Sequence, residues 1–491
     1  MKKIIARLMA GGSSVILNDM EKQTENHADL IILGSGSTAF AAALHAASYG
    51  ARVLMVEKSV MGGTCVNWGC IPSKTLIHAA LFSHEAGLGA ALGLGYWRSE
   101  VDVERLSSRR DQVVKRLRQE RYLDVLQSFP GLELIKGTAR FLDPRTIEVD
   151  ERSFRADRFL VAVGGVPRVP AIPGLKGVDF LTSRTALLLK KIPDSMIIVG
   201  GGVIAVELGQ MFNRLGTAVT ILEHGHCLLP AVEREPAEAL RDLLMRAGVR
   251  VVLNATICSA GAGGGVTTVS AEVDGVRQEF KGERLLLAVG TAPATEGIGL
   301  EHAGVTVDRK GFIVTDPHLR TSVPGIWAAG DVTGGMMIAT VGAREGILAV
   351  DDMFNPGCAC PMDYLSAPMA IFTDPELGLV GHSEESARQA GLDVVVNVMP
   401  VAAIPKAHVT GHTAGVIKMV ADRSSGRLLG VHLLCHRGAE LINAAALALR
   451  LHATIDDLAT TLPVYPTMSE GLRLCAQGFS RDITRLSCCA E

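Results

Sequence analysis

The sequence predicts a multidomain α/β protein in which helices cover mostly parallel sheets and a last domain is of the α+β type. A chain of 491 residues is too long for one hydrophobic core, and 48% hydrophobic residues without a long polar tract indicate a compact fold. A unit of apolar strand, glycine turn and helix occurs twice, and from about Tyr364 strands and helices alternate without such turns. Repeated strand–helix units favour parallel sheets, because a helix has to carry the chain back before the next strand.

The first unit begins with the apolar residues 28–33, which predict a buried strand. Gly34, Gly36 and Ala39 follow at the start of an alanine-rich helix, and a second strand over 51–56 ends at Glu57. Glycines in these positions permit a tight turn, and a pyrophosphate can then lie on the helix N-terminus. The acidic residue after the second strand is placed to accept hydrogen bonds from ribose hydroxyls, so the pattern predicts a dinucleotide site.

The same pattern occurs a second time further along the chain. It has strands at 196–199 and 218–222 and, in the matching positions, Gly200, Gly202, Ala205 and Glu223. In both copies the acidic residue lies 23 positions after the first glycine, Gly34 to Glu57 and Gly200 to Glu223. Two matches with equal spacing and equal context predict two Rossmann-like dinucleotide-binding domains.

Prolines mark the points where the chain crosses between these domains. The apolar segments 159–165 and 285–290 each lead into prolines, which is typical of a chain leaving a sheet. The domain boundaries expected from these signals are an N-terminal extension at 1–27, a first nucleotide domain at 28–165 and 291–362, a second at 166–290, and an interface domain at 363–491.

Charge and composition exclude several classes of partner. The net charge is −3 without a basic block, which argues against nucleic acid as a partner. The sequence contains no stretch of 18 uncharged apolar residues, so no membrane span is predicted. Ten cysteines in 491 residues are too few for a disulfide scaffold. We therefore expect a cytoplasmic protein, in which paired cysteines are catalytic or bind metal.

One cysteine pair lies just after the first nucleotide-binding motif. Cys65 and Cys70 are separated by four residues, and Pro72 and Lys74 follow. This spacing suits a redox-active disulfide at the start of a helix, where the helix dipole and the nearby lysine lower a thiol pKa. The alternative is two unpaired cysteines in the core.

Residues 62–74, both glycine turns and the segment 329–331 together resemble the pyridine nucleotide–disulfide oxidoreductases, and the resemblance extends over residues 28–491. It implies FAD on the first turn, NADPH or NADH on the second, and a homodimer formed by the C-terminal domain. In that family Cys70 would be the thiolate beside the flavin and Cys65 the exchanging thiol, while Lys74 would approach the flavin and pair with Glu207. Further contacts to FAD would come from Thr64, Ala139, Asp331 and Ala339.

The chain departs from the disulfide reductases of this family near its C-terminus. These enzymes use a histidine–proline dipeptide followed by a glutamate as general base, whereas this chain has Tyr465 before Pro466 and retains Glu470. A phenol with a pKa of about 10 is a poor base for a dithiol at neutral pH. Disulfide substrates are therefore disfavoured, unless Tyr465 is simply a core aromatic residue.

A second cysteine pair, Cys488 and Cys489, stands two residues from the C-terminus. Adjacent thiolates are soft donors that select thiophilic metal ions, and chain ends are often free to reach other sites. Together with Tyr465, this pair resembles the mercuric reductase branch of the family. The resemblance implies that Hg(II) is received as a thiol complex by the partner subunit's tail, passed to Cys65 and Cys70, and reduced to elemental mercury.

Alternatives to this function stay open at the level of sequence. The terminal pair is also compatible with a vicinal disulfide of no function or with an electron relay to another protein. The whole chain is compatible with a dihydrolipoamide dehydrogenase-like enzyme or with a flavoprotein that sequesters metal without turnover.

The preferred nicotinamide also stays open. Glu223 suits the free 2′-hydroxyl of NADH, and only His224 stands nearby as a cation for the 2′-phosphate of NADPH. Among the remaining cysteines, Cys358 and Cys360 are expected on a surface loop. Four others are expected to pack as small hydrophobic residues, namely Cys227, Cys258, Cys435 and Cys475.

Overall fold

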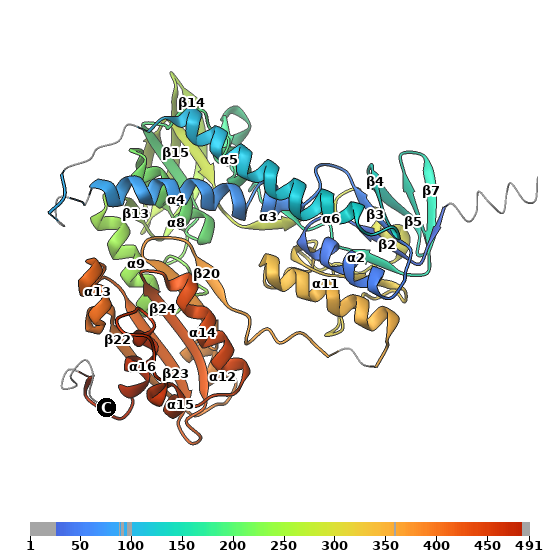
Figure 1. The fold of residues 1–491 in the computed structure, drawn as a ribbon. Coiled ribbons are helices and arrows are strands. Elements are labelled where there is room, and N and C mark those ends of the chain that lie inside the picture. The colour runs from blue at the N-terminus through green and yellow to red at the C-terminus, as the bar shows by residue number, and fades with distance from the viewer. Residues whose placement is uncertain (1–25, 88, 90–92, 96–100, 358–359, 484–491) are drawn as a thin grey trace, which may run out of the picture. The chain divides into compact units, whose positions relative to one another are not determined.

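The computed structural model describes residues 26–483 except 88, 90–92, 96–100 and 358–359. The chain folds into two compact units (Figure 1). The first comprises the described residues up to Asn67 together with 114–166 and 292–362, and the second comprises 68–113, 167–291 and the described residues from Asp363 onward. No helix in the described part of the chain is long and apolar enough to cross a membrane.

The first unit is built on a five-stranded parallel sheet. Its strand order is β19-β8-β2-β3-β4. The strands are β2 (Leu30–Leu33), β3 (Val53–Glu57), β4 (Leu132–Lys136), β8 (Phe159–Val161) and β19 (Ile326–Ala328). Alternate residues of β2 enter two different apolar clusters, Ile31 and Leu33 one and Leu30 and Ile32 the other. Because both faces of the sheet are covered, the strand is a continuous hydrophobic run.

Two helices pack closely in this unit, α2 (Ser37–Ser48) and α11 (Ala339–Phe354) (Figure 1). A Cβ atom on Gly346 of α11 would lie 2.4 Å from the backbone oxygen of Thr38 in α2, so only glycine permits this approach. A second sheet has the order β1-β7-β6-β5. Its strands are β1 (His27–Ala28), β5 (Ala139–Asp143), β6 (Thr146–Val149) and β7 (Arg152–Ala156).

Short helical elements complete the first unit. They are α3 (Gly63–Asn67), η2 (Gln119–Leu123), α6 (Asp124–Gln127), α10 (Leu300–Ala303) and η4 (Asp331–Thr333). The chain passes between the two units within α5 (Val103–Arg118) and near β9 (Gly165–Pro167) and β18 (Thr291–Pro293).

The second unit contains another five-stranded parallel sheet, with the order β10-β17-β11-β12-β13. Its strands are β10 (Phe180–Leu181), β11 (Ser195–Val199), β12 (Ala218–Leu222), β13 (Arg250–Val252) and β17 (Arg284–Leu287). Its helices are α4 (Cys70–Gly87), η3 (Leu175–Gly177), α7 (Ser183–Ala186), α8 (Val203–Arg214) and α9 (Arg234–Arg246). An antiparallel sheet is formed by β14 (Ala255–Gly263), β15 (Val266–Val273) and β16 (Val276–Gly282). Leu76 and Ala80 of α4 share one apolar cluster with Val206 of α8.

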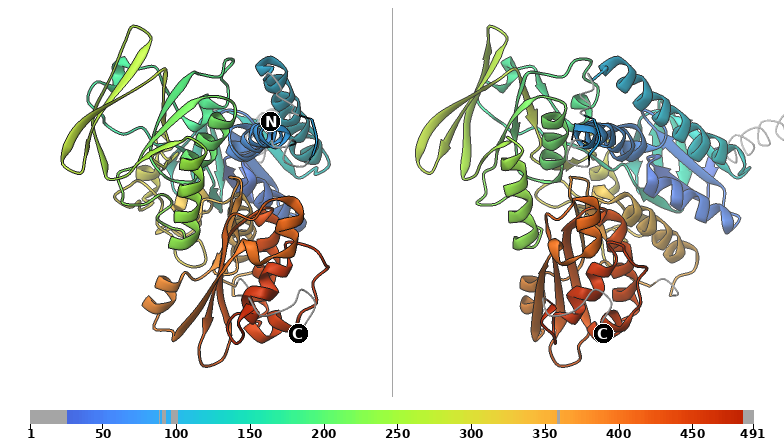
Figure 2. Two further views of the ribbon diagram at one scale, coloured as in Figure 1. Left: turned by 90° about the vertical axis from the view of Figure 1, so that its left-hand side faces the viewer. Right: turned by 60° about the vertical axis from the view of Figure 1, so that its left-hand side comes forward.

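The C-terminal part of the second unit is a five-stranded antiparallel sheet with the order β20-β21-β24-β23-β22 (Figure 2). Its strands are β20 (Met369–Ile371), β21 (Glu376–Gly381), β22 (Val394–Pro400), β23 (Val416–Asp422) and β24 (Leu428–Cys435). The helices around it are α12 (Glu384–Gln389), η5 (Val401–Ala403), α13 (Pro405–Thr410), α14 (Gly438–Arg450), α15 (Ile455–Thr460) and α16 (Glu470–Gln477). The α+β type expected for this region is therefore confirmed.

The strand expected over 28–33 is in fact two strands in different sheets. The chain leaves β1 after Ala28 and enters β2 at Leu30, and between them Asp29 accepts a hydrogen bond of 2.8 Å from the backbone nitrogen of Arg52. The apolar pattern predicts burial on either side of Asp29 but does not reveal that the chain changes its sheet there. The prediction for residues 1–27 lies outside the described residues except for its last two.

Candidate active site

The first glycine turn connects β2 to α2 through a conformation that only glycine tolerates well. Gly34 has a φ of +112°, and a Cβ atom there would lie 2.3 Å from the backbone oxygen of Ala162. Gly36 is the N-cap of α2 and has no side chain to bond the first amide groups of the helix. Ala39 is fully buried, which lets the helix pack closely on the sheet. These features fit a pyrophosphate at the helix N-terminus.

The second turn, between β11 and α8, repeats this geometry. Gly200 has a φ of +110°, and a Cβ atom there would lie 2.4 Å from the backbone oxygen of Ala288. Gly202 is the N-cap of α8 without a side-chain cap, and Ala205 is fully buried. The two turns therefore present equivalent backbone amides at the N-termini of two separate helices.

An acidic residue stands beside each turn. Glu57 ends β3 and accepts hydrogen bonds from Ser35 Oγ at 2.6 Å and from the backbone nitrogen of Ser59 at 2.7 Å. Glu223 follows β12 and accepts a hydrogen bond of 2.6 Å from the backbone nitrogen of Gly225. Each carboxylate is thereby held at the carboxyl end of its strand, which fits the recognition of ribose hydroxyls.

Other residues expected to contact FAD are distributed over the first unit. Asp331 begins η4, and burial raises the pKa of its carboxyl group. Thr64 is exposed in α3, Ala139 is buried at the start of β5, and Ala339 is the first residue of α11. A Cβ atom on Gly330, next to Asp331, would lie 2.5 Å from Thr38 Oγ1, so this segment is tightly packed against α2.

The cysteine pair lies on two consecutive helices. Cys65 is in the short helix α3, and Cys70 is the first residue of α4; both are partly buried. A thiol at a helix start is favoured as a thiolate by the helix dipole. Asn67 stabilises α3 and the turn before it, because its Nδ2 donates hydrogen bonds to the backbone oxygens of Met61 and Gly63, each at 2.9 Å.

Sequence reasoning did not identify Asn67 as a positioning residue, nor its partner Arg118. Arg118 Nη1 donates a hydrogen bond of 3.1 Å to Asn67 Oδ1 from 51 positions away. The one signal in the sequence was the position of an asparagine between two cysteines. The structure shows that this asparagine is buried, and a buried amide requires hydrogen-bond partners.

The best-defined polar contact of the site joins Lys74 to Glu207. Lys74 Nζ lies 2.8 Å from Glu207 Oε2, and Glu207 Oε1 accepts a hydrogen bond of 2.8 Å from the backbone nitrogen of Phe372. The ammonium group also lies 4.7 Å from the centre of the Phe372 ring, which is a cation–π contact. Glu207 is buried, and these partners offset the cost of burying its charge.

The segment before α16 holds the residues that stand where a base is expected. The Tyr465 side chain is exposed to 50%, and the Tyr465–Pro466 peptide is cis. Glu470 is buried at the start of α16 and accepts a hydrogen bond of 3.3 Å from the backbone nitrogen of Thr467. Burial raises the pKa of Glu470. Cys488 and Cys489 lie outside the described residues.

The remaining cysteines differ in burial from one another. Cys435 and Cys475 are fully buried as expected, and burial raises the pKa of each thiol to about 12. Cys227 and Cys258 are only partly buried, which is less than we expected for cysteines that pack as small hydrophobic residues. Cys360 is exposed, and Cys358 lies outside the described residues.

Two family models match the chain. Residues 28–346 match the pyridine nucleotide-disulphide oxidoreductases, and residues 367–476 match the dimerisation domain of the same family. Together the two matches include both glycine turns, the cysteine pair and the C-terminal antiparallel sheet.

Individual relatives are similar over nearly the whole chain. A mercuric reductase of Lysinibacillus sphaericus is 40% identical over 95% of this chain and 85% of its own length. A mercuric reductase of Streptomyces lividans is 37% identical over 94% of this chain and 98% of its own length. A dihydrolipoyl dehydrogenase of Thermus scotoductus is 38% identical, with 92% of this chain and 98% of the relative covered.

A solved structure shares the fold. The Cu(II) complex of the HOCl-induced flavoprotein disulfide reductase RclA from Escherichia coli superimposes with a TM-score of 0.82 at 32% identity. The match covers 92% of this chain and 99% of RclA. The predictions of an α/β oxidoreductase that uses FAD and a nicotinamide dinucleotide are confirmed by these findings. The chain belongs to the pyridine nucleotide-disulphide oxidoreductases.

Proposed function

We propose that this enzyme reduces mercuric ion to elemental mercury with NADPH or NADH as the electron donor. One NAD(P)H gives up a hydride, Hg(II) gains the two electrons, and a proton is released to solvent. The proposal is carried by a combination of two features. A cysteine stands at the start of α4, and Tyr465 occupies the position of the expected base. The two mercuric reductases that are 40% and 37% identical to this chain support the same substrate.

The absence of an imidazole at position 465 decides between substrates. A disulfide substrate yields two thiolates that must be protonated and deprotonated, and a histidine with a pKa near neutrality performs this well. A metal ion bound by thiolates requires no such proton transfer. Tyr465 therefore suits a metal substrate, and the buried Glu470 accepts a hydrogen bond from the backbone nitrogen of Thr467.

The described residues suggest how each cofactor is held. Residues 28–165 and 291–362 would bind FAD, with the amides beyond Gly34 on its pyrophosphate, and residues 166–290 would bind the nicotinamide dinucleotide beyond Gly200. When bound, FAD supplies two-electron transfer between NAD(P)H and the sulfur pair. Residues 363–491 would form a homodimer interface, and we propose a cytoplasmic location for the enzyme.

In this proposal the chain's own side chains receive, hold and release the metal. Cys488 and Cys489 of the partner subunit would take Hg(II) from a thiol complex and pass it by thiolate exchange to Cys65 and Cys70. Tyr465 of the partner subunit would shape that inner site. Lys74, held by Glu207, lies one turn after Cys70 on the same helix, and the N-terminus of that helix would favour a thiolate at Cys70. Elemental mercury has no affinity for thiolates and leaves.

The proposal is tested with FAD-loaded enzyme under anaerobic conditions. The enzyme is mixed with NADPH or NADH, mercuric chloride and an excess of small thiol, and volatile mercury is measured together with nicotinamide oxidation. We expect one mercury atom per nicotinamide oxidised and no turnover in Cys65→Ser or Cys70→Ser. Nicotinamide oxidation that does not depend on the metal, or rapid reduction of lipoamide instead, would refute the proposal.

A further inference from the structure

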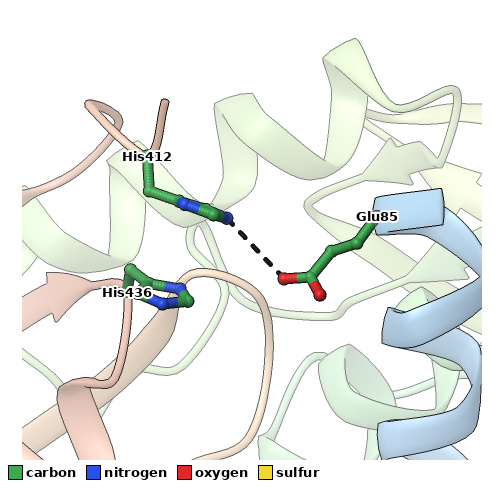
Figure 3. A group of neighbouring side chains, drawn as sticks. All are labelled: Glu85, His412 and His436. Carbon is green, nitrogen blue, oxygen red and sulfur yellow. Dashed lines mark ion pairs between the residues drawn. The ribbon is translucent and has the colours of Figure 1, made fainter. Parts of the chain in front are cut away.

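Glu85, His412 and His436 come from three separate parts of the second unit and meet at one point (Figure 3). Glu85 lies in the last turn of α4, His412 follows α13, and His436 lies between β24 and α14. The possible ligand atoms of the three side chains all lie within 4.8 Å of one another. None of the three has a role in the redox site proposed above.

Their spacing does not correspond to ordinary hydrogen bonding. His412 Nε2 lies 3.7 Å from Glu85 Oε1, which is too long for a hydrogen bond. It is close to the separation of about 3.3 Å between two ligand atoms on a tetrahedral ion with bonds of about 2.0–2.1 Å. His412 Nδ1 is buried and has no hydrogen-bond partner among the described residues.

The two imidazole rings stack on each other. Their centres are 4.0 Å apart and their planes differ by 21°. The lone pair of an imidazole nitrogen lies in the ring plane, so one ring has to turn out of the stack before both histidines can face one ion.

We propose that Glu85, His412 and His436 bind a divalent transition-metal ion, Zn²⁺, with solvent in the fourth position. Two imidazole nitrogens and one carboxylate oxygen are a ligand set for this borderline ion, whereas Ca²⁺ and Mg²⁺ require more oxygen ligands. Mercuric ion is softer and prefers the thiolates of the redox site. The side chains of His412 and Glu85 are 29% and 39% exposed, which leaves room for a bound water.

Binding requires rotation of side chains. The ligand separations, at most 4.8 Å, have to shrink to about 3.3 Å, and the partly exposed side chains of Glu85 and His412 can rotate to supply this. His436 also lines a cavity of about 480 Å³. Lys406, Arg437 and Glu440 line the same cavity, and the carboxylate of Glu85, on the other side of the cluster, adds a negative charge that favours a cation.

A bound ion would connect the helix α4 to the C-terminal part of the second unit. The helix α4 begins at Cys70 and ends two residues after Glu85, while both histidines belong to the C-terminal part of the second unit. A bound ion would therefore fasten the far end of the helix that carries Cys70.

The test uses FAD-loaded, oxidised full-length enzyme whose accessible thiols have been alkylated with N-ethylmaleimide and whose metals have been removed with a chelator. ZnCl₂ is titrated in by calorimetry, and we expect one ion per chain. His412→Ala and His436→Ala should each weaken Zn²⁺ binding by at least about 100-fold, since loss of even an outer partner costs 10–100-fold. Glu85→Gln should weaken it by at least about tenfold.

A matched control is available in the first unit. His302 Nε2 lies 3.6 Å from Glu301 Oε1, the same residue types at nearly the same spacing but without a second imidazole. His302→Ala should therefore leave Zn²⁺ binding unchanged. X-ray absorption of the wild-type zinc complex gives a readout that does not depend on any variant: nitrogen and oxygen ligands at about 2.0–2.1 Å are expected.

Three results would overturn the proposal. They are a failure of the alkylated wild-type enzyme to bind one zinc ion, equal affinities in the wild type and in both histidine variants, and sulfur ligands at about 2.3 Å in the absorption spectrum.

Discussion

Lys74 and Glu207 form an ion pair of 2.8 Å that ties the helix beginning at Cys70 to the helix of the second glycine turn. Glu207 is the more buried partner, with 6% of its side chain exposed against 31% for Lys74. The pair therefore fixes the lysine side chain one turn after Cys70 and gives a partner to a carboxylate that is almost fully buried.

Removing the lysine should destabilise the protein. Lys74→Met leaves the buried Glu207 with the Phe372 backbone as its remaining partner, and we expect a loss of about 3 kcal/mol in the free energy of unfolding. Denaturant titration of the FAD-loaded enzyme measures this, and the double variant Lys74→Met with Glu207→Gln should recover part of the loss. The exposed pair Lys191–Glu283, at 3.8 Å, is the control: Lys191→Met should cost less than about 1 kcal/mol. Equal losses for both lysines would contradict this interpretation.

Glu223 should determine the preference between the two nicotinamides. Its carboxylate is held beside the second glycine turn by the backbone of Gly225, where it would repel a 2′-phosphate. Glu223→Ala should raise the ratio of kcat/KM for NADPH to that for NADH by about tenfold, which corresponds to about 1.4 kcal/mol. Steady-state kinetics with both cofactors measure the ratio, and Glu279→Ala, on an exposed strand position, should leave it unchanged. An unaltered ratio in Glu223→Ala would show that the carboxylate does not contact the ribose.

Replacing Tyr465 by histidine should introduce the base that disulfide chemistry requires. An imidazole in this position should raise the rate of NAD⁺ reduction by dihydrolipoamide by at least about 100-fold, the lower end of the usual gain from general-base catalysis. Tyr465→Phe removes the hydroxyl without adding a base and serves as the control, with no such gain. If Tyr465→His stays as inactive as the parent, the missing imidazole is not what limits disulfide turnover.

The stability of the protein should depend on pH through Glu470 in a direction opposite to that of most carboxylates. Burial raises the pKa of Glu470 in the folded state, so the folded protein binds a proton more tightly than the unfolded chain. Stability from this group is present below the ordinary pKa of 4.5 and is lost as the pH rises through the folded-state pKa. Glu470→Gln should remove this loss. The free energy of unfolding of the variant, relative to that of the parent enzyme, should therefore be higher at neutral pH than at pH 4.

Asp422 provides a control of opposite sign. Hydrogen bonds from Ser425 and Ser424 lower the pKa of Asp422 to about 2. Its contribution to stability is present above 3.8 and is lost as the pH falls toward 2. In denaturant titrations at several pH values, Asp422→Asn should lower the free energy of unfolding at neutral pH but not at low pH. If the free energies of the Glu470 and Asp422 variants changed with pH in the same direction, the burial of Glu470 would not be its cause.

The terminal cysteines should matter most when mercury is presented on bulky thiols. Replacement of Cys488 and Cys489 by alanine should slow turnover of such complexes, because the ion then has no exchanging thiolates outside the inner site. Small ligands that reach Cys65 and Cys70 directly should be reduced at a rate closer to that of the parent enzyme. Equal rates in parent and variant with every mercury complex would remove the delivery role.

Much of the fold could be predicted because its signals are local. The strands around Gly34 and Gly200 are short apolar runs, and a positive φ followed by a helix without a side-chain cap requires glycine at the turn. The break at Asp29 could not be predicted, since its neighbours Ala28 and Leu30 are both apolar and buried and differ in the sheet that they join. The burial of Cys227 and Cys258 was misjudged because composition does not place a residue relative to the protein surface.

Motif spacing alone predicted the two dinucleotide turns and the redox role of the cysteine pair, since each motif lies within a few consecutive residues. The environment of these motifs depends on residues distant in the chain. Lys74 and Glu207 are 133 positions apart, and Glu85, His412 and His436 belong to no motif that a reader of the chain would recognise. Packing of helices and strands brings such groups within a few ångströms of one another. The ion pair of the buried carboxylate and the stacking of the imidazole rings form only after that packing.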